Sequence, residues 1–234
     1  MKTLRQQFHR RLAPILFLLA VAVAPLHAAD THYLPDGKPN YVELLAPPPL
    51  PGSPEQAADM GLVQLAYHAT GSNEIAIAYS EKKFDIFNFT PAIGGFFQPG
   101  KFPKTEAFFE RVQKQAADVT DEAKDFYKRP RPFVTDPSLA NGKLEKTFSY
   151  PSGHSTESMV LALVLADLFP EKHDAIIAEA RNIGWHRVEI ARHYLTDIYA
   201  GRVLAQAIVR EMKKSPDFQK DFAEAQAELA AAQK

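Results

Sequence analysis

The stretch Tyr150-Pro151-Ser152-Gly153-His154-Ser155 decides how we interpret the chain, because it joins a polar loop to a long apolar run. Either Ser152 or Ser155 can cap the helix that starts here, and the free N–H groups of a helix start favour an anion. Gly153 lets the backbone approach that anion closely. His154 would stand on the first turn, where an imidazole can transfer a proton.

The composition predicts a soluble globular protein of one domain. The chain has 234 residues, of which 46% are hydrophobic and 24% are charged. Cysteine is absent, so burial of a core alone must stabilise the fold, which a chain of this size can achieve.

Residues 1–28 predict a secretory signal peptide. Four cationic residues precede an apolar run over 12–26, which is shorter than the ~20 residues of a spanning helix and contains two prolines. We expect cleavage after Ala28 or Ala29, a periplasmic location and no membrane attachment afterwards. The mature chain would carry 23 Lys and Arg against 28 Asp and Glu, so no nucleic-acid surface is expected. A monomer and a homo-oligomer are both compatible with the sequence.

The pattern of apolar residues predicts an all-α fold, a compact single-domain helical bundle with an extended arm before it. Apolar residues recur at three- and four-residue spacing, and no strand is predicted. The proline-rich arm, 29–54, is expected to cross the domain without helix. The predicted helices are 55–68, 72–82, 104–128, 152–169, 171–192 and 195–214 in a domain over 55–215, followed by a C-terminal helix in 216–234. Segment 129–150 is predicted as a loop, and 84–103, rich in Phe and Gly, as core or pocket rim.

A cationic cluster ends the third of these helices, where residues 124–132 read Lys-Asp-Phe-Tyr-Lys-Arg-Pro-Arg-Pro. A lysine there, such as Lys124, commonly does no more than interact with the helix dipole, and that alternative stays open. Arg131 differs, because the prolines on both sides restrict its backbone and preset the guanidinium to bind two phosphate oxygens at once.

A third cluster lies in residues 185–197. His193 and Asp197 are four residues apart, so on a helix they share a face, and the carboxylate can fix the tautomer that leaves one imidazole nitrogen nucleophilic. Arg187 comes six residues earlier and would point about 120° away from that face. We therefore expect the helix to break near Arg192. An ordinary surface His–Asp pair is the alternative.

Together the three clusters resemble the type 2 phosphatidic acid phosphatase superfamily and, within it, the class A bacterial nonspecific acid phosphatases. The residues that carry the resemblance are Lys124 with Arg131-Pro132, then Pro151-Ser152-Gly153-His154, then Arg187 with His193 and Asp197. The arm segment 44–49, Leu-Leu-Ala-Pro-Pro-Pro, is also similar to the class A enzymes.

The resemblance implies a secreted acid phosphatase that hydrolyses small soluble phosphomonoesters through a phosphohistidine, without metal or cofactor. It also implies phosphotransferase activity and inhibition by vanadate. His193 would be the nucleophile, Asp197 its orienting partner and His154 the acid for the leaving alcohol. The phosphate would be bound by Lys124, Arg131, Ser152, Gly153 and Arg187.

His186 departs from the resembled pattern, which usually has serine at this position. If the imidazole faces the pocket, its protonation and substrate binding are linked, and we expect the nearby cations to oppose its charge in the empty site. The alternative is that His186 only packs beside Trp185.

Two other functions remain as alternatives. The related haloperoxidases bind vanadate in the same pocket, although this chain is short for such an enzyme. A non-enzymatic periplasmic metal-binding protein would use His186, His193 and Asp197 as one helix face. A membrane lipid phosphatase is disfavoured, because no predicted helix after residue 30 has a long uncharged run.

Overall fold

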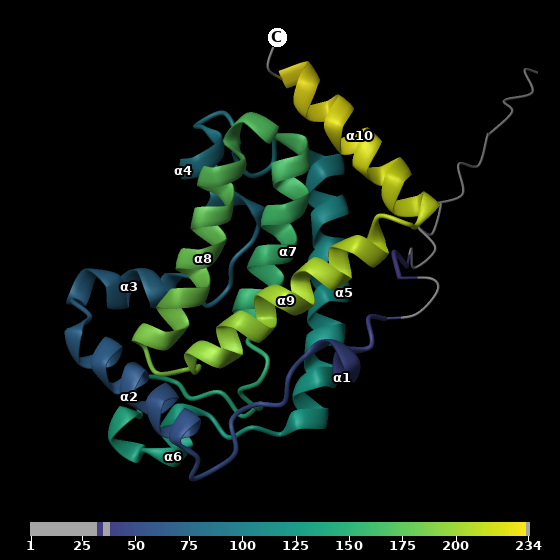
Figure 1. Cartoon of the computed structure of the whole chain (residues 1–234). Coiled ribbons are helices and arrows are strands. Elements are labelled where there is room, and N and C mark those ends of the chain that lie inside the picture. The colour runs from purple at the N-terminus through teal and green to yellow at the C-terminus, as the bar shows by residue number, and fades with distance from the viewer. Residues whose placement is uncertain (1–31, 35–37, 233–234) are drawn as a thin grey trace, which may run out of the picture. The chain divides into compact units, whose positions relative to one another are not determined.

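The computed structural model describes residues 32–34 and 38–232, so the predicted signal peptide lies outside the described residues. Within these ranges every regular element is a helix, as Figure 1 shows. The all-α prediction is confirmed.

The helices differ widely in length. The long ones are α2 (Pro54–Ala69), α3 (Ser72–Ser80), α5 (Pro103–Tyr127), α7 (Gly153–Leu168), α8 (His173–Glu189), α9 (Leu195–Met212) and α10 (Pro216–Ala232). The short ones are α1 (Tyr41–Leu44), α4 (Thr90–Ile93), α6 (Pro132–Thr135) and the 3-10 helices η1 (Ile86–Phe89), η2 (Pro137–Leu139) and η3 (Pro170–Lys172).

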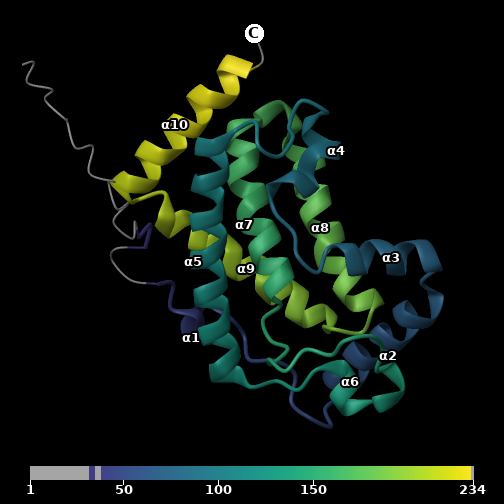
Figure 2. The same cartoon turned by 180° about the vertical axis from the view of Figure 1, so that it is seen from behind.

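Helix α7 is the centre of the core. It packs against α5, α8 and α9, and Figure 2 shows it behind α5 and beside α8. Its sequence is apolar or small on nearly all sides, from Ser158 to Ala166, and most of these residues are buried. A helix that is apolar all round is stable only inside a protein. The stretch that decides the fold therefore begins the most buried helix.

The proline-rich arm packs on the domain, as expected, but it is not free of helix. Tyr41–Leu44 form the single turn α1, because the first proline after Tyr41 is Pro47 and nothing earlier in the turn blocks its hydrogen bonds. The Tyr127 hydroxyl donates to the carbonyls of Tyr41 and Leu45, both over 3.2 Å. The arm is thus held by the last turn of α5.

The two segments without predicted helices also contain short ones. Segment 84–103 includes η1 and α4, and segment 129–150 includes α6 and η2. Proline stands within the first two residues of α4, α6 and η2, where its missing N–H costs nothing and its fixed φ suits a helix. Pro132 and Pro137, two of the prolines behind the loop prediction for 129–150, therefore begin single turns.

Tyr33, near the first described residues, and the C-terminal helix α10 both contact α5. The Tyr33 hydroxyl donates to Asp221 of α10 over 2.6 Å, and Arg111 of α5 donates to the same carboxylate over 2.7 Å. Phe108 and Phe218 pack edge to face beneath them, with ring centroids 5.2 Å apart. No helix in the described ranges is both long and apolar enough to cross a membrane.

Two helical glycines should respond oppositely to alanine. A Cβ on Gly201 of α9 would lie 2.9 Å from the Ser152 carbonyl oxygen, whereas a Cβ on Gly61 of α2 would meet nothing within 4 Å. Overpacking costs about 1–3 kcal/mol, so Gly201→Ala should lower the free energy of unfolding. Gly61→Ala should raise it by about 0.5–1 kcal/mol, the difference in helix propensity. Denaturant unfolding measures both, and a stabilised Gly201→Ala protein would contradict the close contact of α7 and α9.

Candidate active site

The start of α7 is bonded to the start of α9. Ser152 caps α7, and its hydroxyl accepts from the Ser155 N–H over 3.3 Å. The Ser152 N–H donates to the Asp197 carbonyl over 3.1 Å, and the Ser155 hydroxyl donates to the Ile198 carbonyl over 2.8 Å. Of the two serines considered for the cap, Ser152 is the one used, while Ser155 joins the two helices.

His193 and Asp197 lie side by side at the break between α8 and α9. The break includes Ala191 in a left-handed conformation, with φ 53°, and the prediction of a break near Arg192 is confirmed. His193 therefore precedes α9 instead of sharing a continuous helix face with Asp197. The Asp197 carboxylate caps α9 by accepting from the Tyr194 N–H over 2.9 Å, and Asp197 Oδ2 is 3.4 Å from His193 Nδ1.

The neighbours of His193 determine which ring nitrogen carries the proton. Arg131 Nη1 lies 3.2 Å from His193 Nε2, and a guanidinium only donates, so Nε2 presents its lone pair. Nδ1 then carries the proton and faces Asp197 and the Ser149 hydroxyl, each at 3.4 Å. Burial, followed by the charge of Arg131, lowers the pKa of His193 from 6.5 to about 3. His193 is therefore a neutral imidazole with an unprotonated Nε2.

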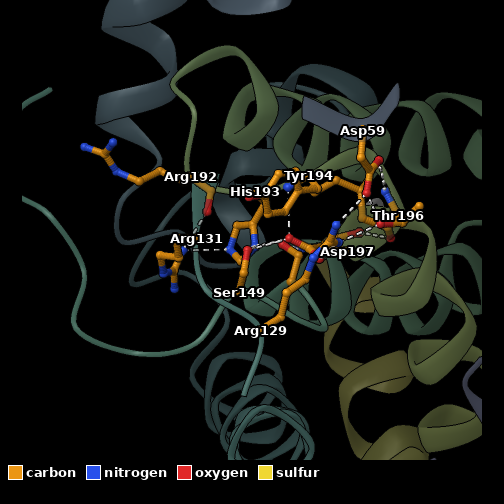
Figure 3. A network of polar contacts seen from close by, with 12 residues as sticks. Asp59, Arg129, Arg131, Ser149, Arg192, His193, Tyr194, Thr196 and Asp197 are labelled. Carbon is orange, nitrogen blue, oxygen red and sulfur yellow. Dashed lines mark hydrogen bonds and ion pairs between the residues drawn. The ribbon is translucent and has the colours of Figure 1, made fainter. Parts of the chain in front are cut away.

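A buried guanidinium holds Asp197 in turn (Figure 3). Arg129 Nη1 donates to Asp197 Oδ1 over 2.6 Å, and Arg129 Nη2 donates to Asp59 of α2 over 2.8 Å. The Thr196 hydroxyl bonds to both Arg129 and Asp59. The Arg129 guanidinium also lies 3.8 Å from the centre of the Tyr194 ring. Asp59 and Arg129 are site residues that the sequence analysis missed.

The carboxylate of Asp197 stays ionised despite complete burial. Burial alone would raise the pKa of Asp197, but the hydrogen bond with His193 and the charge of Arg129 outweigh it and lower the pKa. The Ser149 hydroxyl also donates to Oδ2 over 2.5 Å. Asp197 can therefore act as a fixed negative charge behind the imidazole.

Two of the predicted phosphate-binding cations reach the site from the last turn of α5, which carries Lys124, and from the segment after it, which carries Arg131. Lys124 Nζ would lie 3.1 Å from a Cβ on Gly153, so a side chain at Gly153 would collide with the lysine. Arg131 is buried, and both Nε and Nη2 bind Thr147, over 2.8 and 2.9 Å. Thr147, rather than the flanking prolines alone, fixes this guanidinium.

The third predicted cation, Arg187, is buried on α8. Its Nη2 donates to the Ala78 carbonyl and lies 3.5 Å from Glu81 Oε2. Its Nε is buried and has no hydrogen-bond partner among the described residues. A buried donor without a partner costs about 1–3 kcal/mol, so an oxygen of a bound ligand would relieve it.

His154 stands on the first turn of α7 among these charges. Its Nε2 lies 3.1 Å from the Glu81 carbonyl, and its ring packs 5.3 Å from that of Phe84. Burial, then the charge of Arg187, lowers the pKa of His154 well below the ordinary value. A bound anion on Arg187 would oppose that shift and favour a protonated His154.

His186 makes a polar contact, and its surroundings favour the protonated imidazole. Its Nδ1 lies 2.9 and 2.8 Å from the two carboxylate oxygens of Glu81. Burial alone would lower the pKa of His186, but the hydrogen bond and charge of Glu81 outweigh it and raise the pKa above 6.5. Arg187 opposes the charge of His186, as expected, but the carboxylate of Glu81, which contacts both side chains, outweighs it.

Glu157 is a further carboxyl group at the site that the sequence analysis did not single out. Its Oε1 would lie 3.4 Å from a Cβ on Gly153, and its Oε2 accepts from Gln113 over 3.1 Å. Burial raises the pKa of Glu157 to about 7. It lies one turn after His154 on α7, a spacing that alone could have suggested it.

The structure thus brings the three predicted clusters to one place. The charges of Arg187, His193 and Lys124 act on the pKa of His154. Arg131 contacts His193, and Ser152 contacts Asp197. The residues found only here are Asp59, Glu81, Arg129, Thr147 and Ser149, from distant segments or loops, and Glu157, one turn after His154 on α7.

The alternative metal face is not formed. His186 lies on α8, whereas His193 and Asp197 follow the break, so the three do not share one helix face. Among the described residues no group of three or more His, Cys, Asp or Glu side chains could hold a metal ion.

Comparisons with known proteins agree on one family. A family model described as the PAP2 superfamily matches residues 115–220, which include all three clusters. The chain is 30% identical over 194 residues to an acid phosphatase of Zymomonas mobilis, with 79% of this chain and 74% of that protein covered. It is 30% identical over 228 residues to a non-specific acid phosphatase of Salmonella typhi, with 92% and 91% covered. A solved structure, the transmembrane PAP2 type phosphatidylglycerolphosphate phosphatase of Bacillus subtilis, has 19% identity and a TM-score of 0.49, covering 68% of this chain and 84% of that chain.

His193 and His186 should titrate in opposite directions from the ordinary value. In the ligand-free protein His193 should stay neutral down to about pH 3, whereas His186 should remain charged above pH 6.5. Because folded His193 binds fewer protons than the unfolded chain, its burial should cost stability as pH falls from 6.5 towards 3. His186 should stabilise the fold below pH 6.5 and lose that effect as pH rises through its raised pKa.

Histidine-labelled protein followed by NMR from pH 3 to 9 measures both groups, with His193→Gln and His186→Gln identifying the signals. A His193 signal that titrated near 6.5 would contradict the buried, cation-flanked imidazole seen here.

Proposed function

Because the chain belongs to the PAP2 superfamily and is an acid phosphatase related to the nonspecific enzymes, we propose that it hydrolyses small phosphomonoesters through a phosphohistidine on His193. The observation that carries the proposal is the unprotonated His193 Nε2, whose lone pair faces Arg131 Nη1 at 3.2 Å while Nδ1 faces Asp197. A nucleophile of this kind needs an unprotonated nitrogen and a partner that fixes its tautomer.

The first step forms a bond between His193 Nε2 and phosphorus as the ester P–O bond breaks. The leaving oxygen takes a proton from His154, and Asp197 stabilises the positive charge that develops on the phosphorylated imidazole. In the second step His154 removes a proton from water, the water oxygen bonds to phosphorus, and the P–N bond breaks. Inorganic phosphate leaves, and His193 is neutral again.

The charge of the transferring group would be neutralised by protein groups. Lys124, Arg131 and Arg187 supply three cations, and the start of α7 supplies the N–H of Gly153. Phosphoryl transfer depends mainly on such positioning and electrostatic stabilisation. We propose that this donor set makes a metal ion unnecessary, so activity on p-nitrophenyl phosphate should persist in EDTA.

The low pKa of His193 suits a nucleophile that acts at acidic pH. An imidazole with a pKa of about 3 keeps its lone pair at pH 5, where an ordinary histidine is mostly protonated. Substrate binding would let His154 take up a proton from solvent, because the phosphate dianion offsets the cations that, together with burial, lower the pKa of His154.

We further propose that the enzyme is exported to the periplasm and acts there on soluble substrates. Support comes from residues 1–28, with their cationic start, apolar run and Ala28-Ala29. Which phosphomonoester is preferred depends on the pocket rim in 84–103 and 129–150, and a panel of substrates assayed on the mature protein would identify it.

Replacing the two catalytic histidines should separate the two steps. His193→Ala should abolish turnover and phosphoenzyme formation, because no other group is placed to attack. His154→Ala should lower kcat by about 100-fold or more and let a phosphoenzyme accumulate with p-nitrophenyl phosphate, whose leaving group needs little acid assistance. Rapid quench with radiolabelled phosphate ester measures both. A full yield of phosphoenzyme in His193→Ala would refute the assignment of the nucleophile.

Vanadate should inhibit more strongly than phosphate. A pocket complementary to a trigonal-bipyramidal phosphorus favours vanadate, which adopts that shape, so its inhibition constant should be at least about 100-fold lower. Alcohols should also capture the phosphoryl group from His193 in competition with water. Equal inhibition by the two anions, together with no transfer to added glycerol, would argue against a covalent intermediate. Haloperoxidase activity of the vanadate-loaded protein, the alternative function, can be assayed on the same sample.

A further inference from the structure

Glu81 links three side chains of the candidate site. It directly follows α3 and is 3% exposed. Its carboxylate binds His186 Nδ1 over 2.8 Å and approaches Arg187 Nη2 to 3.5 Å, while its backbone carbonyl lies 3.1 Å from His154 Nε2. One residue outside all three motifs therefore contacts a predicted phosphate ligand, the predicted acid and the histidine that departs from the family pattern.

The same carboxylate oxygen serves both partners. Glu81 Oε2 is the atom that approaches His186 Nδ1 and Arg187 Nη2. A carboxylate only accepts hydrogen bonds, so Nδ1 carries a proton in either charge state of the ring. The second proton, on His186 Nε2, decides whether the ring neutralises Glu81 or leaves its full charge to Arg187.

Arg187 is where this charge matters for a ligand. Its Nη2 is already anchored to the Ala78 carbonyl, whereas its buried Nε has no hydrogen-bond partner in the described part of the chain and would donate to a phosphate oxygen in the proposed complex. A negative Glu81 next to Arg187 repels a phosphate dianion bound to the same guanidinium. A charged His186 removes most of that repulsion without touching the phosphate.

Resting on the proposed function, we propose that His186 controls phosphate binding indirectly, by neutralising Glu81 beside Arg187, so that affinity for the substrate phosphate falls when the imidazole loses its proton. His186 is thus a positioning residue, and Glu81 is the group through which it acts. The pair would restrict efficient binding to acidic and neutral solution.

The surroundings favour the charged form of His186. Two further carboxylates on α8 contribute: Glu189, which accepts from Trp185 Nε1 over 2.8 Å, and Glu179, whose pKa is raised by burial and then by the charge of Glu81. The charged and titratable groups that face the pair are Tyr79 from α3, His154 from α7, and Glu179, Arg187 and Glu189 from α8. Carboxylates outnumber cations in this set, and the raised pKa of His186 agrees with that balance.

Sulfate is a suitable probe because it remains a dianion across the range in which phosphate itself ionises. Its dissociation constant, measured by calorimetry from pH 5.5 to 8.5, should rise by about fivefold to tenfold more in the wild-type protein than in Glu81→Gln. At pH 5.5, His186→Gln, which keeps a neutral donor, should bind sulfate about fivefold to tenfold more weakly than the wild type does. Glu81→Gln combined with His186→Gln should restore the affinity of the wild type at that pH.

His173→Gln provides a matched control, because His173 forms an exposed pair with Asp174 at the beginning of α8, over 2.9 Å, and should leave the sulfate profile unchanged. Glu157 and His154 titrate in all variants, so differences between variants report on the pair alone. Superimposable profiles of wild type and His186→Gln would overturn the inference, as would a double variant that binds no better than His186→Gln. The first comparison suffices if Glu81→Gln does not fold.

The result can be separated from the proposed function. An inactive wild-type protein would refute the phosphatase mechanism whatever the sulfate data show. An active wild type with a sulfate affinity unaffected by His186→Gln would refute only the role of Glu81 and His186.

Discussion

The buried Arg129 guanidinium between two carboxylates is the contact on which the site depends. It binds Asp59 of α2 on one side and Asp197 of α9 on the other, and all three side chains are at most 5% exposed. Removing one member of such a set costs about 3–5 kcal/mol, because a buried charge is left unpaired. The first long helix of the domain is thereby tied to the carboxylate that orients His193, although α2 contributes no motif residue.

The site combines cations with carboxylates in a fixed arrangement. Lys124, Arg131 and Arg187 would be unfavourable together without a ligand, and after burial their charges contribute to the lowered pKa of His154 and His193. Glu81 and Asp197 offset part of that charge. Glu81 contacts Arg187, and Asp197 contacts His193. A bound phosphate would complete the balance, and its negative charge would favour a protonated His154.

Sequence predicted the site in so far as it depends on local spacing. The cap at Ser152, the break near Arg192 and the helix bounds follow from residues within a few positions of one another. Glu81, Asp59 and Arg129 could not be found that way, because each acts through a partner about 70 or more positions away. Their residue types carry no local signal, since a glutamate after a helix or an arginine before a proline is ordinary. The turn α1 was missed for the opposite reason, since nearby prolines were given too much weight.

The departure at His186 shows how one substitution changes the charge balance of a shared site. A serine would offer Arg187 and a phosphate a neutral neighbour at any pH. An imidazole there needs a counter-charge to be buried, and Glu81 provides it, but Glu81 then lies against Arg187. The repulsion between that carboxylate and a bound phosphate depends on pH. The charge of Glu157, which lies near Lys124 and has a pKa of about 7, depends on pH as well. His193, with a pKa of about 3, is neutral throughout the acidic range. The upper pH limit of activity would then be set by the groups that share the cations with the substrate, rather than by the nucleophile.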